Sequence, residues 1–91
     1  MPRIYVSVDA EGLPGIFSVA QLTPKAPLFS ELRKIMLRVV SVTAEELQKM
    51  GYEVWVADSH GFMGNIDYTE LPDNVTLIRG SERALSMVTG I

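Results

Sequence analysis

The chain has 91 residues, of which 47% are hydrophobic and 21% charged, and 11 acidic against 8 basic residues give a net charge of -3. This composition is typical of a globular protein and argues against a disordered chain. The scattered lysines and arginines argue against a nucleic-acid partner, and the absence of cysteine excludes disulfides and thiol nucleophiles. No apolar run approaches the roughly 18 residues of a membrane span, and the first residues do not resemble a signal peptide. We therefore expect a cytoplasmic protein without membrane contact.

The first part of the chain is predicted to form one strand and a long loop. Residues 3–9, RIYVSVD, are rich in β-branched and aromatic side chains, and their mostly apolar character is typical of a strand covered on both faces. Residues 10–27 are interrupted by glycines and prolines, which predicts a loop. Long loops in small domains are often functional, so the segment 13–27 is a candidate lid or oligomer contact.

Residues 29–50 show the period of an amphipathic helix. The apolar residues that recur at steps of three and four, and that we expect to be buried, are Phe29, Leu32, Met36, Val39, Val40, Leu47 and Met50. Ser30 is the predicted N-cap, and Gly51 is the predicted C-terminal stop.

Two further strands are predicted, at residues 52–57, with Trp55 in the core, and at residues 75–78. A loop is expected between them over 58–73, and a last helical turn over 82–88. A strand–helix–strand crossover of this length implies a parallel pair with a right-handed connection. The predicted fold class is α/β, with a parallel-sheet strand–helix–strand core in a single domain over residues 1–91, or in part of a domain.

Polar side chains follow the first two predicted strands at the point where each strand ends. Asp9 and Glu11 end the first strand, and Asp58 and His60, the only histidine, end the second. Residues two apart in extended backbone point to the same side, about 7 Å apart between Cα atoms. Because parallel strands bring their carboxyl ends to one edge of the sheet, these side chains can converge there. Carboxylates and an imidazole suit zinc, manganese or iron.

Other interpretations of these residues remain open at this stage. An Asp-x-Glu pair at a strand end is often a solvated turn, and a single histidine is often a hydrogen-bonded structural residue. Ser7 and Ser59 are conceivable nucleophiles, but no G-x-S-x-G elbow surrounds either. The chain has no G-x-G-x-x-G or P-loop pattern, so nucleotide binding is not expected.

Four segments together resemble a known family. The sequence contains YVSVDAEGLPGI, WVADSHGFMGNI, LIRG and SMVTG. In order and spacing these resemble the N-terminal part of the DppA-type D-aminopeptidases, peptidase family M55. The resemblance implies a zinc-dependent aminopeptidase that releases N-terminal D-amino acids from short peptides and assembles into a ring-shaped homo-oligomer.

The resemblance also implies roles for individual residues. The zinc ligands of the SVDxEG and DSHG motifs fall on Asp9, Glu11 and His60, and Asp58 becomes a supporting acid that accepts a hydrogen bond and orients the ligands. Asn65 matches a further motif position without a chemical role that the sequence explains. A complete site in this family holds two zinc ions, and its remaining ligands and a catalytic histidine come from a region beyond Ile91.

We therefore expect the chain alone to be a weak or inactive peptidase. It is either one piece of a truncated or split enzyme, or it assembles with a second chain or further copies that complete the site. The alternative is a non-catalytic oligomerising or peptide-binding module associated with dipeptide transport.

Overall fold

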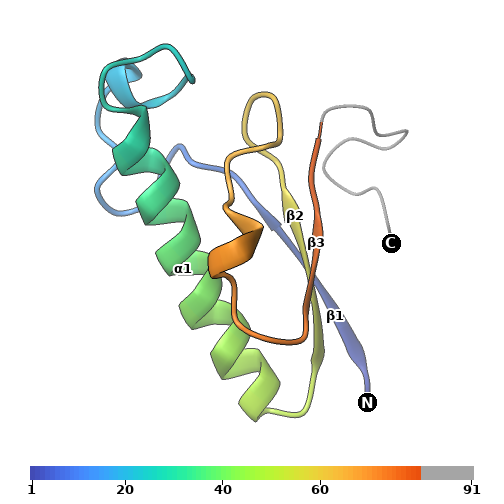
Figure 1. The fold of residues 1–91 in the computed structure, drawn as a ribbon. Helices are drawn as coiled ribbons and strands as arrows, with labels where there is room; N and C mark the ends of the chain where they lie inside the picture. Colours follow the sequence, from blue (N-terminus) through green and yellow to red (C-terminus); the bar gives the residue numbers. More distant parts are fainter. Residues whose placement is uncertain (81–91) are drawn as a thin grey trace.

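The computed structural model describes residues 1–80, which form a three-stranded parallel sheet with one long helix beside it (Figure 1). The strands lie in the order β1-β2-β3, and α1 connects β1 to β2. The elements are β1 (Arg3–Val8), η1 (Val19–Gln21), α1 (Phe29–Lys49), β2 (Glu53–Asp58), η2 (Tyr68–Glu70) and β3 (Val75–Ile78). The predicted α/β class and the parallel strand–helix–strand core are confirmed.

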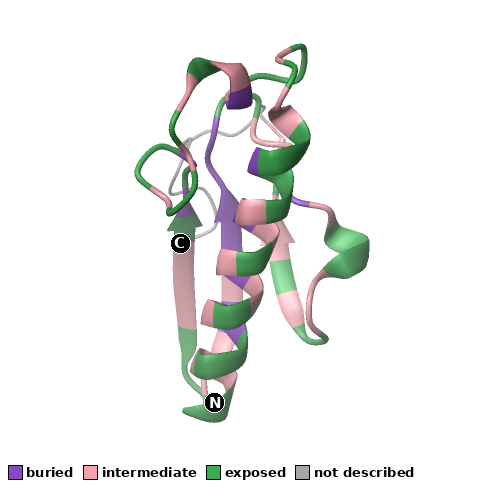
Figure 2. Cartoon of the chain, turned by 90° about the vertical axis from the view of Figure 1, so that its left-hand side faces the viewer, coloured by how far each residue is buried: buried purple, intermediate pink, exposed green. Residues whose placement is uncertain are grey.

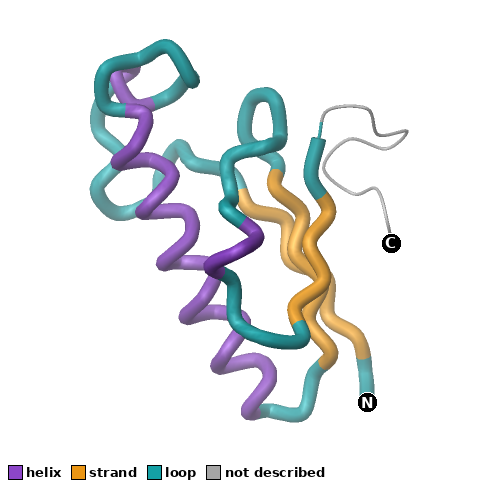
Figure 3. The backbone as a smooth tube through the Cα atoms, viewed as in Figure 1, coloured by secondary structure: helices purple, strands orange, loops and turns teal. Residues whose placement is uncertain are grey.

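The sheet places alternate side chains on the face that α1 covers. Ile4 pairs with Val54, and Val56 pairs with Leu77, so branched apolar residues of all three strands line this face. Branched side chains pack well on a pleated surface, which explains why these segments form strands. Figure 3 shows α1 running along the sheet, with the loops that follow β1 and β2 leaving from the same end. That end carries the candidate site.

The helix turns one stripe of side chains toward the sheet, and its opposite side is largely exposed (Figure 2). The buried residues follow one another at steps of four, which is close to one helical turn: Leu32, Met36, Val40 and Ala44. The predicted burial of Met50 is wrong, because this residue lies past the last turn and its exposed fraction is 70%. Trp55 is also not in the core. It is half-buried on the other face of the sheet, with the Arg3 guanidinium 4.1 Å from its ring centroid.

The start of α1 differs from the prediction and its end agrees with it. The N-cap is Leu28, without a side-chain cap, and Ser30 lies in the first turn. The Leu28 amide donates to the Ala20 carbonyl, so the preceding loop fixes the entry into the helix. Gly51 has φ +92°, a conformation that favours glycine, and it ends the helix as predicted.

The remaining differences are small. The first strand ends at Val8, one residue early, and the second is shifted by one residue to Glu53–Asp58. The short helices η1 and η2 interrupt the two predicted loops.

Among the described residues α1 covers one face of the sheet, and Ser7 on the other face is exposed, so the expected cover on both faces is not seen there. The predicted turn at 82–88 lies outside the described residues. Within residues 1–80, no helix has the length and apolar character needed to cross a membrane.

Candidate metal centre

The first two strands end level with each other. Val8 pairs with Asp58 in the parallel register, and the Ser59 amide donates to the Val8 carbonyl at 2.8 Å. Asp9 therefore leaves β1 beside the point where His60 leaves β2. Gly12 has φ +96°, which turns the chain directly after Glu11 and keeps this residue near the sheet edge.

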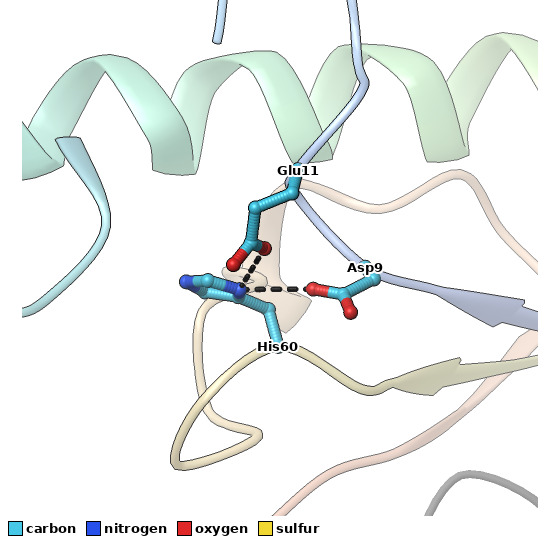
Figure 4. Close-up of side chains that lie close together, drawn as sticks. All are labelled: Asp9, Glu11 and His60. Atoms are coloured by element: carbon cyan, nitrogen blue, oxygen red, sulfur yellow. Dashed lines mark hydrogen bonds and ion pairs between the residues drawn. The ribbon is translucent and has the colours of Figure 1, made fainter. Parts of the chain in front are cut away.

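Three side chains meet at this edge, and we call them the Asp9–Glu11–His60 cluster (Figure 4). The Nδ1 atom of His60 lies 2.9 Å from Oδ1 of Asp9 and 2.9 Å from Oε1 of Glu11. One ligand atom from each residue lies within 4.8 Å of the others. The convergence expected from the strand ends is thus present.

The other ring nitrogen of His60 contacts the backbone. Nε2 lies 2.7 Å from the Leu22 carbonyl oxygen, in the long loop after β1. A carbonyl oxygen only accepts, so Nε2 carries a hydrogen. A neutral imidazole then has an acceptor at Nδ1, facing two carboxylates that are also acceptors. Three acceptors converging on one point require a proton or a cation between them.

The directions of the pKa shifts of His60 and Asp9 agree with this arrangement. Burial alone would lower the pKa of His60, but the Leu22 carbonyl and the carboxylates of Asp9 and Glu11 stabilise the imidazolium and raise the pKa above its ordinary value. For Asp9, burial would raise the pKa, but hydrogen bonds from the Ala10 amide and from His60 lower it. The cluster therefore favours positive charge at its centre, from a proton or from a metal ion.

Asp58 holds the loop that carries His60. Its buried carboxylate accepts hydrogen bonds from the Asn65 amide, from Nδ2 of Asn65 at 2.8 Å and from the Ile66 amide at 2.8 Å. Nδ2 of Asn65 also donates to the His60 carbonyl at 2.7 Å. Asp58 accepts hydrogen bonds as expected, and these three come from the loop that follows His60. Asn65, which had no derived role, connects this carboxylate to the backbone of His60.

Two features of the site were not predicted from the sequence, and two serines discussed as nucleophiles have a different partner. The Leu22 carbonyl has no side-chain signature, and Gln21, which precedes it and is fully buried, lies in a segment that the sequence predicts to be a loop. Ser7 and Ser59, the conceivable nucleophiles, contact each other. Their hydroxyl groups lie 2.7 Å apart and hydrogen-bond to each other.

Comparison with known proteins identifies the family. The sequence matches the peptidase M55 family, described as D-aminopeptidase, over residues 2–91. The chain belongs to this family. Among solved structures, the Zn-dependent D-aminopeptidase DppA from Bacillus subtilis, described as a self-compartmentalizing protease, matches with a TM-score of 0.92 and 32% sequence identity. The match covers 96% of this chain and 32% of that one. A comparison with curated protein sequences found no significant match.

The cluster in this M55 family member fits zinc by the chemistry of its donors. Zinc binds imidazole nitrogen and carboxylate oxygen at about 2 Å, and catalytic zinc sites commonly use three protein ligands and keep one open position. Asp9 and Glu11 are exposed, whereas the exposed fraction of His60 is 6%. Small rotations of the two carboxylates can therefore adjust the cluster around an ion while the imidazole stays in place.

A hollow of about 280 Å³ in this M55 chain has Glu11 among its lining residues. Its lining is mostly apolar and includes Ile16, Phe17 and Val19. Phe17 and Val19 are 75% and 81% exposed, which is high for side chains of this size and type. The loop after β1 therefore places apolar surface next to the cluster.

Proposed function

We propose that this chain carries the first part of the metal site of a zinc-dependent D-aminopeptidase, which releases N-terminal D-amino acids from short peptides. The observation that carries the proposal is the convergence of Asp9, Glu11 and His60 at the carboxyl end of the sheet, in a member of the M55 family. Zn-dependence of the similar DppA enzyme supports zinc as the metal.

We assign two roles to residues of this chain: binding the metal ion and holding the loop that carries His60. Asp9, Glu11 and Nδ1 of His60 would hold the ion, and Asp58 would keep the His60 loop in place through Asn65. A zinc ion supplies Lewis-acid chemistry, polarising a carbonyl group and making water more acidic. The group that removes a proton from water is not assigned to any described residue. We propose that it comes, with ligands for a second zinc ion, from outside residues 1–91.

We further propose that the protein acts as an assembly in the cytoplasm, in which the site is completed by residues beyond Ile91, by further copies or by a second chain. The similar DppA is described as self-compartmentalizing, which supports a homo-oligomer. The exposed side chains of Phe17 and Val19 offer apolar surface for such contacts.

A second candidate function is a non-catalytic peptide-binding module. The apolar hollow beside Glu11 favours it, because such a surface can accept a peptide side chain without any metal. The two functions differ in what happens when Asp9 is removed. Catalysis requires this carboxylate, whereas apolar peptide binding does not.

A chimera tests the proposed function. The matching part of Bacillus subtilis DppA is replaced by this chain, and hydrolysis is followed for a dipeptide with an N-terminal D-residue and for its L-counterpart. We expect the chimera to hydrolyse the D-peptide only. Asp9→Ala should reduce hydrolysis to background because it removes a zinc ligand, whereas Asp73→Ala, at an exposed position before β3, should leave it unchanged.

Measurements of the zinc content and peptide binding of the chimera show why it fails, if it does not hydrolyse the peptide. A chimera that folds and retains zinc, but hydrolyses neither peptide, would contradict the enzymatic proposal. If it also binds peptide equally well with and without Asp9, the binding module is the better account.

A further inference from the structure

The long loop after β1 is organised around one buried amide. Gln21 is fully buried. Its Oε1 atom accepts hydrogen bonds from the amides of Phe17 at 2.8 Å and Ser18 at 3.0 Å. Its Nε2 atom donates to the Gly15 carbonyl at 2.9 Å and to Oε1 of Glu31 at 3.3 Å. All four hydrogen-bonding positions of the amide are therefore used.

These contacts connect the loop to the helix. Glu31 lies in the first turn of α1, so the Gln21 amide ties the loop to a rigid element. The Ser18 side chain caps η1 by accepting from the Ala20 amide at 3.1 Å, and the Gln21 side chain completes the capping box. A buried polar network that is fully satisfied specifies one local geometry.

The residue that this network fixes is the next one in the chain. Leu22 follows Gln21 as the C-cap of η1, and its amide donates to the Val19 carbonyl at 3.2 Å. Its own carbonyl lies 2.7 Å from Nε2 of His60. A hydrogen bond to one ring nitrogen decides which nitrogen remains for a metal.

We propose that Gln21 is a positioning residue of the metal site: by fixing the Leu22 carbonyl against Nε2 of His60, it presents Nδ1 of His60 to zinc. This inference rests on the proposed zinc site and adds which nitrogen binds and what holds the ring. The loop 13–27 thereby gains a role that differs from a lid or an oligomer contact.

The sequence makes the test direct, because His60 is the only histidine. The full chain is labelled with ¹⁵N-histidine, and long-range ¹H–¹⁵N NMR spectra are recorded with and without zinc. We expect zinc to shift Nδ1 to a metal-bound position while Nε2 keeps the shift of a protonated nitrogen. Zinc bound through Nε2 would overturn the inference and leave the zinc site standing, whereas a folded chain without zinc at His60 would overturn both.

Variants test the role of Gln21 itself. Gln21→Ala should weaken zinc binding by about 10- to 100-fold, the range for groups that orient a metal ligand, and should mix the two nitrogens in the His60 spectrum. The matched control is Gln48→Ala, because Nε2 of Gln48 donates to the Asp73 carbonyl near the other end of α1. It should change neither readout. If Gln21→Ala lowers the melting temperature but leaves zinc affinity and Nδ1 ligation intact, Gln21 has only a structural role and the inference is wrong.

Discussion

Replacing Asp58 by alanine should lower the free energy of unfolding by about 3 kcal/mol or more, because three buried N–H groups lose their acceptor and each such loss costs about 1–3 kcal/mol. The Asp58 carboxylate is fully buried and accepts hydrogen bonds from the amides of Asn65 and Ile66 and from the Asn65 side chain. Alanine leaves these donors without their acceptor, and unsatisfied buried donors are costly. Denaturant unfolding of the full chain measures the effect.

Asp73→Ala is the matched control for this variant. Asp73 is exposed, so its replacement should change the free energy of unfolding by less than about 0.5 kcal/mol. Because the Asp58 network also holds the backbone of His60, Asp58→Ala should weaken zinc binding as well. A loss of stability no larger than that of the control would show that the His60 loop is held in another way.

Replacing His60 by alanine should weaken zinc binding by more than about 100-fold, beyond the range for groups that only orient a ligand. The imidazole is the buried member of the cluster and its sole nitrogen ligand, so its loss leaves two exposed carboxylates. Competition with a chromophoric chelator measures the affinity. The circular dichroism spectrum of the variant shows whether the fold is retained.

Two glutamates of the chain provide a ligand variant and its matched control. Glu11→Gln should weaken zinc binding, because an amide is a poorer zinc ligand than a carboxylate, whereas Glu46→Gln should not. Glu46 is an exposed glutamate of α1 that pairs with Lys49 at 3.1 Å. Equal effects of the two variants would mean that zinc responds to the net charge of the chain and not to the cluster.

The sequence predicted the element order and the convergence of the cluster because both follow from simple periodicities. Parallel strands joined by a helix bring their carboxyl ends together, so Asp9 and His60 had to lie near each other once the strands were recognised. The errors have local causes. Met50 continues the apolar period beyond the last helical turn, where the sheet no longer covers it, and Trp55 lies beneath the Arg3 guanidinium on the face away from α1.

The support of His60 was not predicted because it depends on a backbone carbonyl and on the shape of a loop. Neither leaves a pattern of side-chain types at Leu22. One signal was present and was missed: Ser18 and Gln21 have the S-x-x-Q spacing of a capping box, which marks a short helix inside the presumed loop. Finding it would have predicted η1, but not the burial of Gln21 or its contact with α1.

The most direct test of the zinc site is the position of the metal itself. Crystals of the full chain grown with zinc would be measured on both sides of the zinc absorption edge, so that anomalous differences locate the ion. We expect an anomalous peak in contact with the carboxylates of Asp9 and Glu11 and with Nδ1 of His60. A well-ordered cluster without an anomalous peak at saturating zinc would contradict the account.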